Sequence, residues 1–428
     1  MNEDFLAYVW KHQYFDKTEL QTTAGEPLAV LQTGQQNTDA GPDFLSASLL
    51  LDGLTWAGSV ELHVKASDWM RHRHTTDRKY DQVILHVVWE NDAAVTRTNG
   101  TAVPVLELKE RVAPELLQTY LRLKQPKPTI PCEPFLNQVR EITKTAMQER
   151  TLLERLELKA TGIREKLKLN GNDWEATTFQ VLMGGFGFKI NQQGFNRLAK
   201  ELPFRVLQKH RHRLFQVEAL LMGQSGFLAE PTAYEYIGQL QQEYAFLQHK
   251  HQLPAPMHRA DWNFLRLRPA NFPTVRLAQL AALFHLREHW FGSFTTFNKL
   301  ADLVLFFQAK PSGYWAKHYL PGRESKSTIA PMGKSSINLL LINVVAPLLV
   351  AYARETDQPE LVEKAVTLLE KLKPEQNHIL SMYEDLQFEN RTAAQSQGLL
   401  ALYHGYCTPV RCLLCAIGAG ILKRAKVA

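Results

Sequence analysis

The residues best suited to chemistry lie between positions 43 and 65 of this 428-residue sequence. Asp43 precedes one apolar segment, and Glu61, His63 and Lys65 occupy every second position of the next. Side chains alternate between the faces of a β-strand, so these three point in one direction. Carboxylates are preferred ligands of Mg²⁺ and Mn²⁺, and a neighbouring basic group can hold an attacking water. The spacing predicts a divalent-metal site at Asp43 and Glu61, with His63 or Lys65 positioning or deprotonating water.

Histidines nearby favour a competing chemistry. Four fall within 24 positions, at His63, His72, His74 and His86. The spacing of His72 and His74 by two residues fits a loop or strand. Together with Asp68 or Asp77, the histidines would form a zinc or two-metal hydrolase site. His86 interrupts the most apolar run of this region, so we expect it to be buried and hydrogen-bonded as a structural residue.

All four cysteines are expected to form one metal-binding unit, comprising Cys132, Cys407, Cys412 and Cys415. The last three follow a C-x4-C-x2-C pattern. In a reducing compartment such a group binds metal more often than it forms disulfides. Four thiolates suit tetrahedral Zn²⁺ or an iron–sulfur cluster. The alternative is three small thiols packed in an apolar core.

An α+β domain over residues 1–124 is expected to position the predicted metal-site residues, which are Asp43, Glu61, His63 and Lys65. A helix is expected at 3–14, followed by strands at 44–51 and 55–65 around the hairpin turn Asp52-Gly53. The continuous β-branched run 83–89 indicates a strand buried on both faces. A further strand is expected at 103–108.

A proline-rich linker is predicted at 125–137, and residues 138–428 form a larger, irregular all-α domain. Its apolar periodicity is helical, and no fixed-length repeat supports a regular solenoid. The expected helical segments are 138–169, 173–184, 191–223, 232–250, 274–308, 335–353, 359–373 and 392–403.

Composition excludes several classes of protein. Apolar residues make up 45% and charged residues 21% of the chain, as in globular domains and unlike disordered or collagen-like chains. The N-terminus lacks the features of a signal peptide. The longest apolar run, 337–351, is shorter than the roughly 20 residues of a membrane span. We therefore expect a cytoplasmic protein that does not enter a membrane.

Charge is unevenly distributed along the chain. Residues 1–110 hold 9 Lys and Arg against 16 Asp and Glu, whereas residues 111–428 hold 40 against 27. Basic residues of the second part interleave with aromatic ones, a pattern suited to phosphate contacts and base stacking. Nucleic acid is the expected partner, contacted by Arg211, Arg213, Arg266, Arg268 and Arg276.

The pattern Pro42-Asp43, a hairpin, and then Glu61 on a strand resembles that of PD-(D/E)xK nucleases. The element order also resembles a restriction-endonuclease-like core. This resemblance implies that Asp43 and Glu61 bind Mg²⁺ or Mn²⁺ for cleavage of nucleic-acid phosphodiesters. The lysine expected two residues after the acid is replaced by His63, and Lys65 lies one step further along the same face.

A second resemblance covers nearly the whole chain. The strings at 40–44, 60–63, 67–69, 83–88 and 268–273, with the C-terminal cysteines, resemble an uncharacterised bacterial domain-of-unknown-function family, number 2851. The lone cysteine and later trio also resemble iron–sulfur nucleases of the CRISPR-adaptation and helicase–nuclease kind, in which the lone cysteine precedes the nuclease motif.

These observations predict a metal-dependent, nuclease-like protein. Two alternatives stay open: the zinc hydrolase centred on His63, His72, His74 and Asp68, and a non-catalytic module that binds nucleic acid or protein. Metal analysis separates the two enzymes, and tight binding without metal-stimulated cleavage would identify the module.

Overall fold

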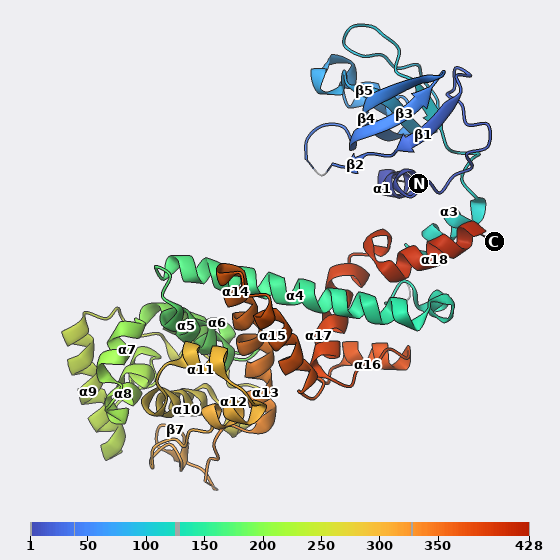
Figure 1. The fold of residues 1–428 in the computed structure, drawn as a ribbon. Helices are drawn as coiled ribbons and strands as arrows, with labels where there is room; N and C mark the ends of the chain where they lie inside the picture. Colours follow the sequence, from blue (N-terminus) through green and yellow to red (C-terminus); the bar gives the residue numbers. More distant parts are fainter. Residues whose placement is uncertain (1, 38, 125–128, 327, 428) are drawn as a thin grey trace. The chain divides into compact units, whose positions relative to one another are not determined.

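A computed structural model describes residues 2–37, 39–124, 129–326 and 328–427, and the chain divides into two units (Figure 1). The first unit comprises residues 1–147 and 402–428, and the second comprises residues 148–401. The division falls within the long helix α4 (Glu141–Leu169). The predicted linker at 125–137 lies partly outside the described residues, at 125–128.

The first unit is an α/β fold around a curled mixed sheet. Its strand order is β1-β3-β4-β5-β6, and β2 also pairs with β3. The strands are β1 (Leu28–Gln32), β2 (Gln35–Gln36), β3 (Phe44–Leu51), β4 (Leu54–Lys65), β5 (Val83–Glu90) and β6 (Val105–Glu107). β3 runs antiparallel to both of its neighbours, β1 and β4, whereas β4, β5 and β6 run parallel to one another.

The hairpin predicted between the strands at 44–51 and 55–65 is confirmed as β3 and β4. Leu51 pairs with Leu54, and both turn residues, Asp52 and Gly53, have positive φ angles of 47° and 75°. Asp-Gly adopts this conformation readily, and its twist matches that of the flanking strands. β3 also contains an irregularity between Phe44 and Ala47, which includes Ser46 at a φ of 57°. The hairpin and this bulge together set which residues of β3 and β4 lie opposite each other.

Strand β5 is the centre of the parallel part of the sheet. Residues 83–88 are all buried, as the unbroken apolar run predicts for a strand with parallel neighbours on both sides. The crossover from β4 to β5 contains α2 (Asp68–Arg71) and two short helical turns, η1 (His74–Thr76) and η2 (Arg78–Tyr80). Helix α1 (Glu3–Lys11) contacts β4, and the Asn2 side chain caps it by accepting from the Phe5 N–H.

The C-terminal segment belongs to the first unit because its last helix packs there. α3 (Pro114–Leu123) lies against α18 (Ala416–Val427). Three short helical segments complete this region: η3 (Glu133–Gln138), η7 (Tyr403–Cys407) and η8 (Cys412–Leu414).

The second unit is helical, as predicted. Besides most of α4, it contains α5 (Trp174–Phe186), α6 (Gln192–Glu201), α7 (Phe204–His210), α8 (Leu214–Gln224), α9 (Glu235–His251), α10 (Pro273–Leu286), α11 (Trp290–Thr296), α12 (Leu300–Phe307), α13 (Lys334–Leu340), η6 (Leu341–Val345), α14 (Ala346–Thr356), α15 (Glu360–Glu370), α16 (His378–Asp385) and α17 (Ala393–Leu402). Two short turns, η4 (Arg259–Asp261) and η5 (Pro269–Asn271), precede α10. A small hairpin is formed by β7 (His318–Leu320) and β8 (Arg323–Glu324). Helix α10 is buried from Pro273 to Phe284 and forms the centre of this unit.

Helix breaks were harder to predict than helices. The segment expected at 191–223 is three helices, and Pro203, which lies between the first two, lacks a backbone donor. The segment expected at 274–308 is likewise α10, α11 and α12. One continuous helix, Lys334–Thr356, is long and apolar enough to cross a bilayer, but 72% of its apolar window is buried inside the fold, as in a core helix.

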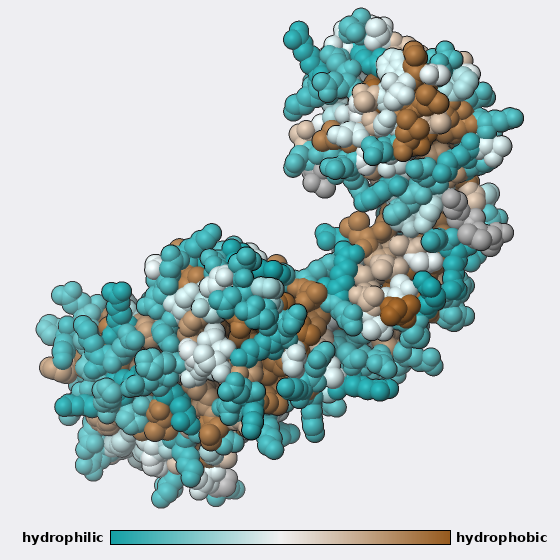
Figure 2. Space-filling view, in the orientation of Figure 1, coloured by the Kyte–Doolittle hydropathy of each residue, from teal (hydrophilic) through white to brown (hydrophobic). Residues whose placement is uncertain are grey.

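Not all apolar surface of the first unit is covered. Several large side chains on its antiparallel strands remain exposed, and Figure 2 shows apolar surface over β1 and β3; they are Leu31, Leu45, Leu50, Leu54 and Trp56.

Replacing Leu85 should weaken the first unit selectively. Leu85 is fully buried in β5, and truncating such a leucine to alanine costs about 2–5 kcal/mol. We therefore expect Leu85→Ala to accelerate amide hydrogen exchange throughout the β4 and β5 peptides. Leu54→Ala is the matched control because Leu54 is 66% exposed, and its exchange should stay as in the wild type. Equal protection in both variants would show that β5 is not the core of this unit.

Candidate metal centre

The hairpin brings the two predicted carboxylates together in a reciprocal contact. The Asp43 N–H donates to Glu61 Oε2 at 3.1 Å, and the Leu62 N–H donates to Asp43 Oδ2 at 3.0 Å. This exchange is possible because Phe44, next to Asp43, pairs with Val60, next to Glu61. Each carboxylate thus fixes the backbone of the other strand, and the two side chains share one end of the hairpin.

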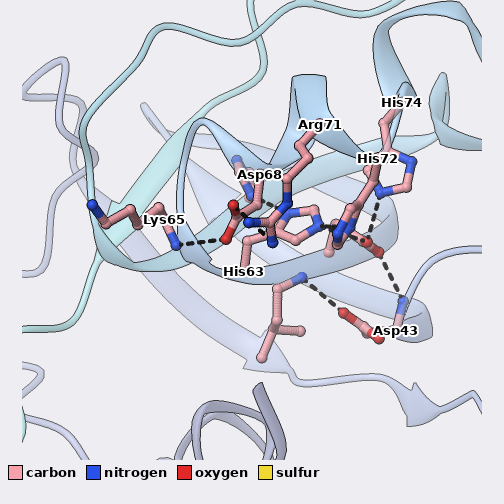
Figure 3. Close-up of polar contacts among 10 residues, drawn as sticks. Asp43, His63, Lys65, Asp68, Arg71, His72 and His74 are labelled. Carbon is pink, nitrogen blue, oxygen red and sulfur yellow. Dashed lines mark hydrogen bonds and ion pairs between the residues drawn. The ribbon is translucent and has the colours of Figure 1, made fainter. Parts of the chain in front are cut away.

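Three imidazoles lie together, and two of them approach Glu61. Ring nitrogens of His63, His72 and His74 all lie within 4.8 Å of one another. Glu61 Oε1 is 3.3 Å from Nε2 of His74 and 3.7 Å from Nε2 of His63. Nε2 of His63 is also 3.0 Å from Nδ1 of His72. Figure 3 shows the three rings gathered beside the β4 strand, with His72 and His74 entering from the crossover.

His63 is held from behind by His86. Nδ1 of His63 lies 2.9 Å from Nε2 of His86, whose own Cα pairs with Glu61 across the parallel strands. His86 is fully buried, which confirms its prediction as a hydrogen-bonded structural histidine. When Nδ1 of His63 carries the proton and donates to His86, Nε2 of His63 is unprotonated and its lone pair faces Glu61. A histidine binds metal through such an unprotonated nitrogen.

Burial keeps the inner histidines neutral. Burial, followed by the charges of His86, His74, His72 and Arg71, lowers the pKa of His63 to about 2. Burial, with the charge of His74, lowers the pKa of His86 to about 3. Neutral imidazoles are the form that binds metal, so these residues need no deprotonation at neutral pH.

The pKa of Asp43 is unusually high for a carboxylic acid. Burial, followed by repulsion from Glu61, raises its pKa to about 7, although the Leu62 N–H acts in the opposite direction. A group that titrates near neutral pH is suited to accept a proton in a reaction.

The exposed side of the cluster carries residues that the sequence did not reveal as members. Glu3, in the first turn of α1, lies near His72, Asp68, Glu61 and Arg71, and burial is the largest cause that raises its pKa. Arg71 pairs with Asp68 at 3.0 Å and is 68% exposed. His72 is exposed too, whereas His63 and His74 are buried. Only the packing of α1 on β4 could place Glu3 here, and no spacing in the sequence reports that contact.

Lys65 and the aspartates of the crossover lie differently from the histidines. Lys65 is exposed at the end of β4, and its side chain points away from His63 (Figure 3). Asp68 is buried and accepts from the Lys65 N–H and from Arg71. Asp77 caps η2 by accepting from the Lys79 N–H. The predicted alternation of Glu61 and His63 is present, but the crossover covers this face, so both are buried at 5% and 2% exposure.

The geometry fits a divalent transition metal. Two ligand atoms at about 2.1 Å from a tetrahedral ion lie about 3.4 Å apart. Three of the separations, 3.0, 3.3 and 3.7 Å, lie near this value, and the ring nitrogens of the three histidines all lie within 4.8 Å of one another. Nε2 of His74 is buried and makes no hydrogen bond among the described residues, and it lies 3.3 Å from Glu61 Oε1. Imidazole nitrogens with one carboxylate oxygen favour zinc or a similar ion over Mg²⁺.

The four cysteines are brought together within the first unit. Cys132 precedes η3, Cys407 ends η7, Cys412 begins η8 and Cys415 precedes α18. Burial raises the pKa of the Cys132 thiol, and the charges of the other three cysteines add to the increase. Burial and the neighbouring Cys415 raise the pKa of Cys412 to about 11.

The five arginines predicted to contact nucleic acid do not share one environment. Arg213, Arg266 and Arg268 are exposed. Arg211 is 9% exposed and stacks over Phe284, at 4.4 Å from the ring centroid, and Arg276 is 4% exposed. A phosphate backbone approaching from solvent therefore reaches three of these guanidinium groups and not the other two.

The protein thus has an α/β unit that contains a histidine–carboxylate cluster. A helical unit is inserted into the sequence of this α/β unit. The chain belongs to the family described as "Protein of unknown function (DUF2851)", whose model matches residues 3–378. No curated protein and no solved structure matches the chain. The matched region contains the histidine cluster and Cys132, and it ends before Cys407, Cys412 and Cys415.

The metal-free centre should lose stability in acid. Histidines of the unfolded chain bind a proton below about pH 6.5, whereas folded His63 and His86 stay neutral to about 2 and 3. The unfolded state therefore binds more protons, and each histidine lowers the free energy of unfolding by about 1.4 kcal/mol per pH unit below 6.5. Asp43 acts in the opposite direction, because its folded carboxyl holds a proton up to about pH 7.

NMR of protein labelled selectively with ¹⁵N-histidine measures directly whether His63 and His86 stay neutral in acid. At pH 4.5 we expect two imidazoles to give neutral-form signals, one of them absent in His86→Gln. Titration of all 15 histidines between pH 6 and 7 would contradict the buried, neutral arrangement.

Proposed function

We propose that this protein is a metal-dependent hydrolase of phosphodiesters whose ion is held by His63, His72, His74 and Glu61. The observation that carries the proposal is the convergence of three imidazoles within 4.8 Å, with the Glu61 carboxylate beside them. A cluster of this kind costs folding energy because it buries polar groups, one of which lacks a hydrogen-bond partner among the described residues. An ion would satisfy those groups at once.

The chain's own residues divide the chemistry between them. A divalent ion held by His63, His72, His74 and Glu61 would lower the pKa of water and offset charge on a phosphoryl oxygen. Asp43, with a pKa near 7, takes the proton of the attacking water. Arg71, exposed beside the cluster, contacts the non-bridging oxygens of the substrate. Substrate reaches the cluster from the side of His72 and Glu3, where the side chains are exposed.

Two features support nucleic acid as the substrate. Asp43 and Glu61 are in contact, and His63 occupies the place of the lysine in the PD-(D/E)xK pattern, so three positions of that motif meet in one cluster. Arg213, Arg266 and Arg268 also present exposed cationic groups for a phosphate backbone. The histidine content favours zinc or manganese over the magnesium that the motif implies. Lys65, which points away, takes no part in this scheme.

Changing His72 should remove the metal. His72 is exposed, so His72→Ala leaves the core intact, and we expect its metal content to lie about one equivalent below that of the wild type. Elemental analysis after dialysis against zinc or manganese measures this. His249→Ala is the matched control, since His249 is an exposed histidine of α9. Wild-type protein without metal, or His72→Ala with the same metal content as the wild type, would refute the site.

Changing Asp43 should stop hydrolysis and spare metal binding. An asparagine at this position still accepts from the Leu62 N–H but cannot take a proton, so we expect a rate at least about 100-fold lower at unchanged metal content. The assay follows cleavage of fluorescent DNA and RNA, single- and double-stranded.

Asp77→Asn serves as the control, because its amide oxygen can still accept from the Lys79 N–H and it lies outside the cluster. Full activity in Asp43→Asn would exclude Asp43 as the base. A metal-loaded wild type that cleaves none of the four substrates would contradict the assignment of phosphodiesters.

The cysteines support a second, structural ion. We propose that Cys132, Cys407, Cys412 and Cys415 bind Zn²⁺ or an iron–sulfur cluster and fasten the C-terminal segment to the first unit. Three of the four are buried, Cys412 is partly exposed, and the charges of the other three all act on Cys132. Thiols grouped in this way gain most from a metal that stabilises their thiolates.

Anaerobically purified protein should contain this second metal. Cys412→Ser should lose it and become sensitive to proteolysis between η7 and α18, while keeping the ion bound at His72. His72→Ala should show the reverse pattern, so each variant is a control for the other. Iron with acid-labile sulfide and visible absorbance identifies the cluster, and colourless zinc identifies the simple ion. Protein with no cysteine-dependent metal would refute the proposal.

A further inference from the structure

A buried cation lies in the core of the helical unit. Arg276 is on the first turns of α10, the most buried helix of that unit, and is 4% exposed. Arginine is among the residues least often buried without a partner of opposite charge. Its position therefore calls for a compensating interaction.

The described residues supply only neutral acceptors for this guanidinium. Nη1 donates to Gln279 at 2.9 Å, and Nη2 donates to Asn271 at 2.6 Å and to Ser336 at 2.8 Å. Nε is buried and has no hydrogen-bond partner in the part of the chain that the structure describes. No carboxylate of the described residues pairs with Arg276. Burial alone lowers its pKa, to about 10, so the group stays charged at neutral pH.

A cavity of about 270 Å³ adjoins this charge. Asn271, Ser335 and Ser336 give it polar groups near Arg276, and the guanidinium also lies 4.8 Å from the centroid of the Phe188 ring. The remaining wall is apolar and includes Phe186, Phe195, Leu267 and Leu339. A dry cavity of about 150 Å³ binds benzene, so this one has room for a single ring with an attached charged group.

We propose that the cavity binds a small organic anion, with its oxyanion on Arg276 and its apolar body against the aromatic wall. A charged acceptor on a guanidinium forms the stronger class of hydrogen bond, and Nε lacks one among the described residues. The hydroxyls of Ser335 and Ser336 supply further donors at the same end. The proposal is independent of the metal centre, which lies in the other unit.

Carboxylate and phosphate share this recognition chemistry, and matched probes distinguish them. Benzoate and phenyl phosphate carry the two groups on the same ring, and benzamide is the neutral control. We expect saturable binding of at least one anion by calorimetry or ligand-observed NMR, and none of benzamide. The tighter anion identifies the group that the site selects. The same anion should also raise the midpoint of thermal unfolding of the wild type.

Variants localise the binding. Arg276→Gln should weaken the affinity at least about tenfold and abolish the thermal shift, since it removes the charge at the site. Ser335→Trp should block the cavity without disturbing the core, because Ser335 is an exposed lining residue. Arg268→Gln, which removes an exposed arginine nearby, should bind as the wild type does.

Three results would overturn the proposal. The first is no saturable binding of either anion by the wild type, and the second is unchanged affinity in Ser335→Trp. The third is tight binding of a 5′-phosphorylated oligonucleotide that Arg276→Gln abolishes while no small anion binds, which would assign Arg276 to a macromolecular ligand.

Discussion

The candidate centre depends on the exchange of hydrogen bonds between two strands and two carboxylates. Asp43 and Glu61 each accept a backbone N–H from the opposite strand, so the side chains are fixed before any ligand arrives. The hairpin turn and the bulge at Ser46 set the register that permits this contact. His63, two residues from Glu61, then enters the cluster because of strand alternation alone. A shift of one residue in this register would separate the carboxylates and turn His63 to the other face.

Buried electrostatics distinguishes this centre from a polar strand face. His63, His74 and Glu61 are buried, and burial, followed by the charges of neighbouring groups, lowers the pKa of His63 and raises that of Asp43. Both shifts favour neutral groups in the metal-free protein. The cluster therefore holds its lone pairs ready while avoiding the larger cost of burying unpaired charge. Arg276 in the helical unit does carry the cost of a buried charge, because its guanidinium stays charged.

Local patterns predicted the parts of the site that neighbouring strands determine. The Asp52-Gly53 turn, the buried strand with His86 and the shared face of Glu61 and His63 follow from turn chemistry and strand periodicity. The place of Lys65 was not predictable, because the strand ends there and its side chain is free to leave the cluster. Glu3 was missed because only tertiary packing of α1 brings it near. Burial of Arg211 and Arg276 was missed because basic residues are usually solvated, and here helix packing overrides that tendency.

The return of the C-terminal segment to the first unit has a consequence for how the protein is made. Residues 402–428 belong to the unit whose other residues precede 148, so that unit stays incomplete until the last helix has left the ribosome. The helical unit, by contrast, is contiguous and has been fully synthesised earlier. Domains fold as they emerge. The order of assembly is therefore the reverse of the order in which the two units begin, and α3 of the α/β unit must wait for its partner helix α18 while the inserted helical unit folds.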